Sequence, residues 1–150
     1  MEGAMRPEER AVQLFTQEKW SCSESVLLAM AEHWGMESEC IPRIATPFRG
    51  GLCGTQHLCG AVSGSLMAIG LQLGRNAAGD DATACVETGK AFLHFIEEEC
   101  GALDCRTLTG LDFSDEEQHN RFLATTRGDV CVGLITRCCR WLAEHLPPQP

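Results

Sequence analysis

Cysteine is the residue type in this chain that is best suited to chemistry. The chain has ten cysteines in 150 residues. Four of them lie where the sequence predicts the start of a helix, and these are Cys22, Cys59, Cys105 and Cys131. A helix N-terminus offers free N–H groups and the positive end of the helix dipole. Because both stabilise negative charge, we predict that these thiols ionise easily. We also predict that the four converge as a redox site or as metal ligands.

Each of these four cysteines has its own helix-start signal. Ser21 and Glu24 form the Ser-x-x-Glu pattern of a capping box around Cys22. Asp104 is a predicted cap immediately before Cys105. Asp129 is a predicted cap two residues before Cys131, and Cys59 stands at the entrance of a long apolar segment.

That apolar segment, 58–73, is the predicted centre of the fold. It carries no charge, so the helix that it forms should be surrounded by protein. It is short for a membrane span, which needs about 20 residues, and we predict no membrane insertion. Gly60 and Gly64 lie one turn apart and would let another backbone approach closely, which makes them a candidate homodimer surface.

The remaining elements are also predicted helices. Apolar residues recur at helical spacing, no run alternates with period two, and no domain linker is visible. We therefore predict one all-α domain over 1–150, a compact bundle of about five to six helices around the 58–73 helix. The other predicted helical segments are 7–19, 22–34, 81–99, 105–110 as a short turn, 114–125, and a last helix that Asp129 caps.

Composition limits the classes of function. The net charge of −9 argues against a nucleic-acid or anionic-membrane surface. The N-terminal residues contain no apolar run, so we predict no secretory signal and a cytoplasmic location. In a reducing cytosol, many cysteines indicate metal or redox chemistry more than a framework of structural disulfides.

Several of these segments together resemble a known family. They are the residues 21–27, the glycine-rich 48–54, the Cys-Gly-Ala-x-x-Gly of 59–64 with the apolar 66–71, 105–110, and Cys131. In this order they are similar to the C_GCAxxG_C_C family of redox-active proteins, from about 15 to 146. The resemblance implies a small helical protein with a cysteine-based redox role, in which the four name-giving cysteines are the four listed above. A related module of split-Soret cytochromes is associated with an iron–sulfur centre, so the resemblance makes a cluster a candidate cofactor.

Three mechanisms remain open at this point. Four thiolates suit an iron–sulfur cluster or zinc, although no Cys-x-x-Cys pair is present. Alternatively, the cysteines carry out thiol–disulfide exchange, with Cys59 as the nucleophile and His57 as a nearby cation or base. A plain exposed loop histidine is the simpler interpretation of His57. The third is a non-enzymatic metal-binding or transporter-associated accessory module. The redox partner is not identified by the sequence.

The other cysteines and the glycine-rich loop have simpler explanations. Cys85 and Cys138 are predicted core residues, and adjacent Cys138 and Cys139 point too far apart on a helix for a relaxed disulfide. Cys53 and Cys100 are candidate resolving thiols, additional ligands or fillers, and Cys40 has no assigned role. The loop 48–54 lacks the pattern of a phosphate-binding loop, and we interpret it as a tight turn.

Overall fold

The protein is all-α, as predicted. The computed structural model describes residues 3–149, and within that range it contains no strand, only an isolated bridge between Leu58 and Asp104. The helices are α1 (Pro7–Gln17), α2 (Cys22–His33), the 3-10 helix η1 (Arg43–Phe48), α3 (Gly60–Leu73), α4 (Thr83–Cys100), α5 (Cys105–Thr109), α6 (Glu116–Arg121), the π-helix η2 (Phe122–Cys131) and α7 (Val132–His145).

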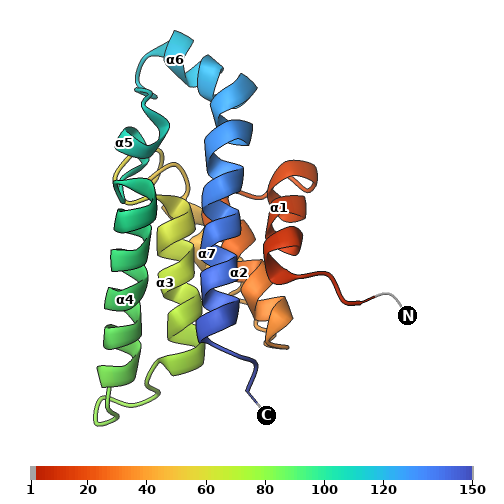
Figure 1. The fold of residues 1–150 in the computed structure, drawn as a ribbon, viewed down its shortest axis with the longest axis vertical. Coiled ribbons are helices and arrows are strands. Elements are labelled where there is room, and N and C mark those ends of the chain that lie inside the picture. Colours follow the sequence, from red (N-terminus) through yellow and green to blue (C-terminus); the bar gives the residue numbers. More distant parts are fainter. Residues whose placement is uncertain (1–2, 150) are drawn as a thin grey trace.

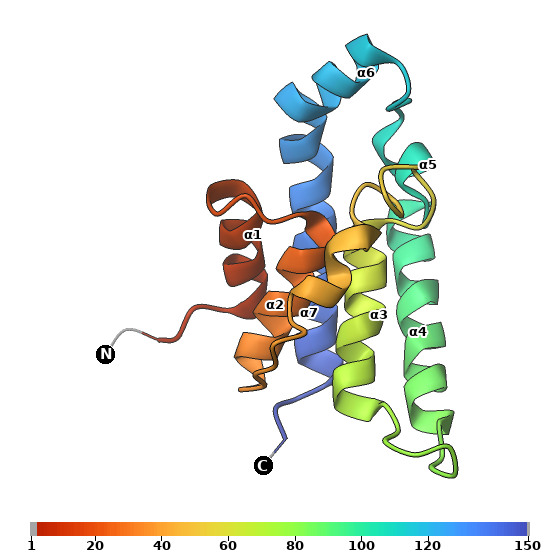
Figure 2. The same cartoon turned by 180° about the vertical axis from the view of Figure 1, so that it is seen from behind.

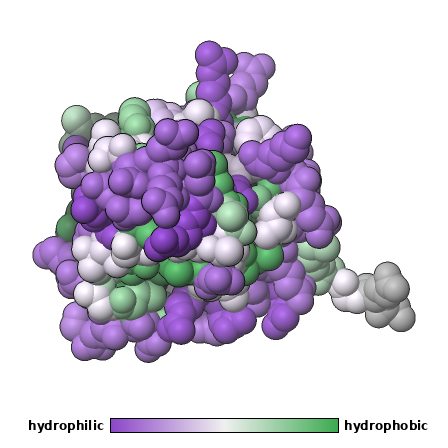
Figure 3. Space-filling view, turned by 90° about the horizontal axis from the view of Figure 1, so that it is seen from above, coloured by the Kyte–Doolittle hydropathy of each residue, from purple (hydrophilic) through white to green (hydrophobic). Residues whose placement is uncertain are grey.

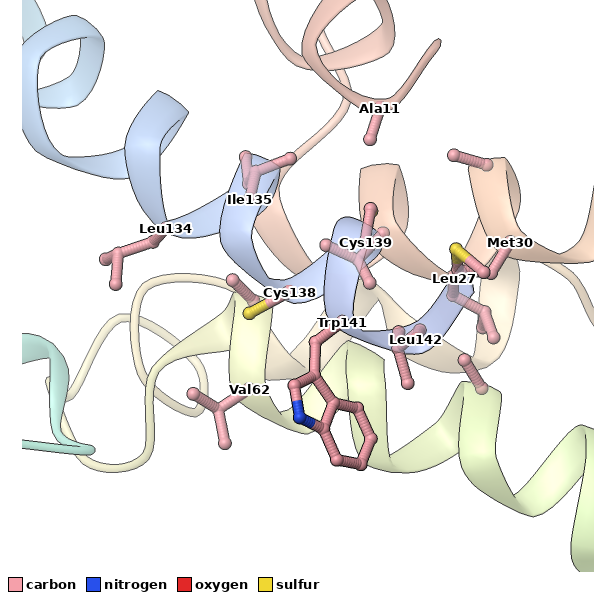
Figure 4. Packing of buried hydrophobic residues seen from close by; sticks show 14 of the residues in the cluster. Ala11, Leu27, Met30, Val62, Leu134, Ile135, Cys138, Cys139, Trp141 and Leu142 are labelled. Atoms are coloured by element: carbon pink, nitrogen blue, oxygen red, sulfur yellow. The ribbon is translucent and has the colours of Figure 1, made fainter. Parts of the chain in front are cut away.

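The predicted apolar helix, α3, lies inside the bundle. It runs between α4 and α7 and packs most extensively against α2 (Figures 1 and 2). Trp141 and Leu142 lie in the core between these helices (Figure 4). The Trp141 ring lies 5.3 Å from the buried Phe92 ring of α4. Burial is strongest in the first half of α3, and Leu71 near its end is 36% exposed.

Gly60 and Gly64 are used inside the chain rather than at a dimer interface. A Cβ on Gly64 would lie 2.6 Å from the carbonyl oxygen of Ser23 in α2. A Cβ on Gly60 would collide with the Cys22 sulfur. The sequence analysis was right that these glycines permit a close backbone approach, but the approaching backbone is α2 of the same chain.

A pair of glycine substitutions in α3 tests this close approach. We expect Gly64→Ala to destabilise the fold by about 2 kcal/mol, because the new methyl group meets α2 backbone that cannot move independently. Gly70 has nothing within 4 Å of its ideal Cβ. Gly70→Ala should therefore stabilise the helix by about 0.5–1 kcal/mol. Urea unfolding of both variants measures the difference, and equal effects would contradict the packing described here.

The end of the chain differs from the prediction. The two helices expected at 114–125 and after Asp129 form one continuous helical segment, α6, η2 and α7. Its middle is π-helical, and Asp129 lies exposed within it instead of capping a helix. Cys131 has α-helical dihedral angles, φ −67° and ψ −35°, at the junction of η2 and α7. The prediction that Cys131 lies at a helix N-terminus is therefore wrong.

The first turns of α4 are less buried than the rest of the helix. Phe92 and Ile96 are fully buried, whereas Val86 is 50% exposed. The first turns of α4 extend beyond the neighbouring core, toward the end of the bundle where α3 also ends (Figure 1). No helix among residues 3–149 combines the length and the apolar character that a bilayer span requires.

Candidate functional site

A cavity of about 470 Å³ lies at one end of the bundle, and all four predicted cysteines line it. Cys22, Cys59 and Cys105 reach it from the starts of α2, α3 and α5, and Cys131 reaches it from the end of η2. Figures 1 and 2 show that these segments, far apart in the sequence, meet near α5 and α6. The predicted convergence of the four cysteines on one place is thus present in the structure.

A short backbone bridge holds two of these cysteines. The N–H of Cys59 donates to the carbonyl of Leu103 at 2.8 Å, and the N–H of Cys105 donates to the carbonyl of His57 at 2.7 Å. The bridge therefore brings the starts of α3 and α5 side by side. Asp104 completes the start of α5, because its carboxylate accepts the N–H of Thr107 at 2.7 Å.

Cys22 is held by the capping box that the sequence predicts. Ser21 and Glu24 accept each other's backbone N–H groups, which fixes Cys22 as the first residue of α2. The backbone N–H groups of Gly50 and Ser23 lie near the Cys22 sulfur and lower its pKa, against the effect of burial. Since Gly60 has no side chain, this sulfur can rest against the first turn of α3.

The acidity of the thiols is opposite to the prediction. Burial, together with the nearby Cys22 sulfur, raises the pKa of Cys105 to about 11. In the same way, burial and the Cys22 and Cys105 sulfurs raise the pKa of Cys131 to about 12. Burial also raises the pKa of Cys22, although its N–H donors act in the other direction. The helix N-termini are present, but desolvation outweighs them.

Cys59 is poorly suited to be the attacking nucleophile in this conformation. It is only 6% exposed, and burial together with the Cys22 and Cys138 sulfurs raises its pKa well above 9.0. His57 does not line the cavity. Its Nδ1 lies 2.7 Å from the Thr55 hydroxyl in an exposed loop, so the simpler interpretation of His57 describes it better.

The raised thiol pKa values predict a loss of stability at alkaline pH. A thiol that stays protonated in the folded protein but ionises at about 9.0 when unfolded costs no stability below pH 9. Above that, stability falls by about 1.4 kcal/mol per pH unit for each such thiol, until the folded pKa is reached. For Cys138 that limit is about 12. Urea unfolding under reducing conditions at about pH 8 and pH 10 measures the slope, and Cys138→Ala should make it shallower. A flat profile would contradict the assignment.

Arg127 is one of two arginines that line the cavity, and the sequence analysis did not identify it. It lies in η2, half-buried, with its guanidinium carbon 3.7 Å from the centre of the Phe15 ring. Its Nη2 donates to the carbonyls of Phe15, at 3.2 Å, and Trp20, at 3.4 Å. Burial lowers the pKa of Arg127, and the sulfurs of Cys131 and Cys22 oppose that effect. π-Helical segments are common at functional sites, and here one carries both Arg127 and Cys131.

Gln56 is a second residue that the sequence analysis did not identify. It is buried, and its amide donates to the carbonyl of Leu111 at 2.7 Å while accepting the N–H of Phe113 at 2.8 Å. Its side chain also hydrogen-bonds the Cys105 sulfur. Gln56 therefore ties the glycine-rich loop to the segment that closes the cavity after α5.

The six other cysteines divide by position. Cys53 is exposed and lines the cavity, in a loop where Leu52 and Cys53 both have positive φ. Cys138 and Cys139 are fully buried, one on each side of α7 (Figure 4). Cys85 and Cys100 are half-buried, and Cys40 is exposed. All ten cysteines are free thiols.

The donor set fits a metal or cluster in chemistry, but its spacing does not fit a single metal ion. Four thiols around one cavity are a ligand set that zinc and iron–sulfur clusters accept. Within residues 3–149, however, no three Cys, His, Asp or Glu side chains are grouped closely enough to hold a metal ion. The thiol positions seen here would have to move inward to bind one.

The comparison with known families agrees with this site. Residues 20–145 match the model of a family described as "Putative redox-active protein (C_GCAxxG_C_C)". The match covers most of the chain, and the protein belongs to this family. Searches of curated proteins and of solved structures gave no match.

Proposed function

We propose that the protein is a thiol–disulfide redox protein whose redox group is formed by cysteines of the cavity. The observation that carries the proposal is that Cys22, Cys59, Cys105 and Cys131, from four separate segments, line the same cavity, to which the loop residue Cys53 adds a fifth thiol. Membership of a redox-active family supports the same class of chemistry. The ten free thiols are suited to a reducing compartment such as the cytosol, which we propose as the location.

In the proposed reaction two cavity thiols become one disulfide. They give up two electrons and two protons, and an external organic disulfide takes these up as it becomes two thiols. We propose Cys22 as one of the two partners, because its sulfur is close enough to raise the pKa of Cys59, Cys105 and Cys131. It also has two backbone N–H donors and the nearby Arg127 to stabilise its thiolate.

An iron–sulfur cluster on the same four cysteines is the second candidate. The N–H groups of Gly50 and Ser23 that reach the Cys22 sulfur favour it, because hydrogen bonds to sulfur tune the potential of such clusters. A bound cluster would supply one-electron transfer. The role of the chain's own residues would be to hold the sulfurs and to shield them from water.

One preparation separates the two candidates. Protein purified without oxygen is examined for visible absorption and for iron, sulfide and zinc, and is then titrated in glutathione buffers of increasing potential. Colourless, metal-free protein that loses two thiols reversibly supports the dithiol proposal. Brown protein with stoichiometric iron and sulfide supports the cluster instead. Protein with neither property overturns both and leaves the accessory-module alternative.

A further inference from the structure

The cavity has a charge distribution that differs from the rest of the molecule. The whole chain carries a net charge of −9. Among the described residues that line the cavity there is no aspartate or glutamate, but there are two arginines, Arg49 and Arg127. The two guanidinium groups are close enough that Arg49 lowers the pKa of Arg127. Two cations held together without an acid indicate a site for negative charge.

Neither guanidinium is held in a salt bridge by the described residues. In the part of the chain that the structure describes, no carboxylate forms an ion pair with Arg49 or Arg127. The buried Glu24 carboxylate is near enough for Arg49 to lower its pKa, but it accepts hydrogen bonds from Ser21, at 2.6 Å, and Thr46, at 2.8 Å, and does not line the cavity. Among these residues, Arg127 donates hydrogen bonds to protein acceptors only through Nη2. Its Nε and Nη1 therefore remain free to bind a ligand.

Part of the cavity lining is apolar and aromatic. The rings of Phe113 and Phe122 lie 4.5 Å apart, and Leu108 and Leu134 also line the cavity. Leu123 at the rim is 56% exposed. Figure 3, which views the molecule from the α6 end, shows apolar side chains between hydrophilic ones on this face. The volume of about 470 Å³ lies in the range of small-molecule sites.

We infer that the cavity binds a small organic anion with an apolar or aromatic body, whose acidic group the two arginines hold beside the thiols. That this anion is the substrate of the thiol site rests on the proposed function. That the cavity binds the anion rests only on the two arginines and the apolar lining.

Two fluorescent probes that differ by one charge test the inference. Anilinonaphthalene sulfonate is an aromatic anion, and phenylnaphthylamine is the same skeleton without the sulfonate. We expect the reduced wild-type protein to bind the anion more tightly than the neutral probe, at one site. Arg49→Gln and Arg127→Gln should each lower the affinity for the anion by about tenfold and leave the affinity for the neutral probe unchanged. Arg127→Lys should retain part of the anion affinity.

The controls keep a folding defect distinct from a binding defect. Arg75→Gln removes the same charge from the loop that follows α3, outside the cavity lining, and should change neither affinity. The inference is overturned if Arg49→Gln leaves the anion affinity unchanged. It is also overturned if the affinities for the two probes fall by the same factor in every arginine variant. Probe binding does not depend on thiol chemistry. If the protein prefers the anion but its thiols do not cycle, the proposed function is wrong and the anion site stands.

Discussion

Cys22→Ser should abolish the redox couple. In a glutathione buffer that oxidises the wild-type protein, we expect the disulfide-containing fraction to fall at least about tenfold, because a hydroxyl cannot form a disulfide. Serine keeps the size of the side chain, so the capping box of Ser21 and Glu24 should still start α2. The measurement is thiol counting by alkylation after equilibration with the buffer.

The matched control for that variant is Cys40→Ser. Cys40 is exposed and does not line the cavity. Its replacement should leave the couple unchanged. If Cys40→Ser removes the couple and Cys22→Ser does not, the redox group lies outside the cavity.

Gly51→Ala should damage both the fold and the site. Gly51 has φ +73°, and a Cβ there would lie 2.7 Å from the Cys105 Cβ and 2.6 Å from the Gln56 Cα. A methyl group must therefore push the glycine-rich loop away from α5, in addition to the strain of a positive φ. We expect a loss of about 3 kcal/mol or more in the free energy of unfolding, together with faster alkylation of Cys105.

Gly54→Ala separates the two causes. Gly54 also has a positive φ, +76°, but nothing lies within 4 Å of its ideal Cβ. This variant should lose only about 1 kcal/mol, from backbone strain, and should leave the alkylation of Cys105 unchanged. Equal effects at the two glycines would show that close packing against Cys105 does not control the site.

Local signals predicted much of this fold. The capping box at Ser21 predicted the start of α2, Asp104 predicted the start of α5, and the uncharged 58–73 segment predicted α3. These signals succeeded because each depends on hydrogen bonds or apolar periodicity within a few residues. The predicted cap at Asp129 was wrong because such a local signal is ambiguous there. An exposed aspartate is tolerated inside a helix at a small cost, so the same residue fits a cap or a continuous helix.

The electrostatics of the site could not be predicted in this way. A helix N-terminus stabilises a thiolate by about 1 kcal/mol or less, whereas removing it from water costs several times more. How far Cys59 and Cys105 are buried depends on the bridge between His57 and Cys105, which is too short to show a strand pattern. Arg127 reaches the cavity because η2 continues into α7, a feature that the predicted break at Asp129 concealed.

The central claim is that the redox-active cysteines are those of the cavity. The most direct measurement is mass spectrometry of all ten cysteines after differential alkylation, on protein equilibrated in reducing and in oxidising glutathione buffers. The account predicts that Cys22 and at least one of Cys59, Cys105 and Cys131 change state together, while buried Cys138 and Cys139 react only after unfolding. Oxidation confined to Cys40 or Cys85, with the cavity cysteines unchanged, would contradict it.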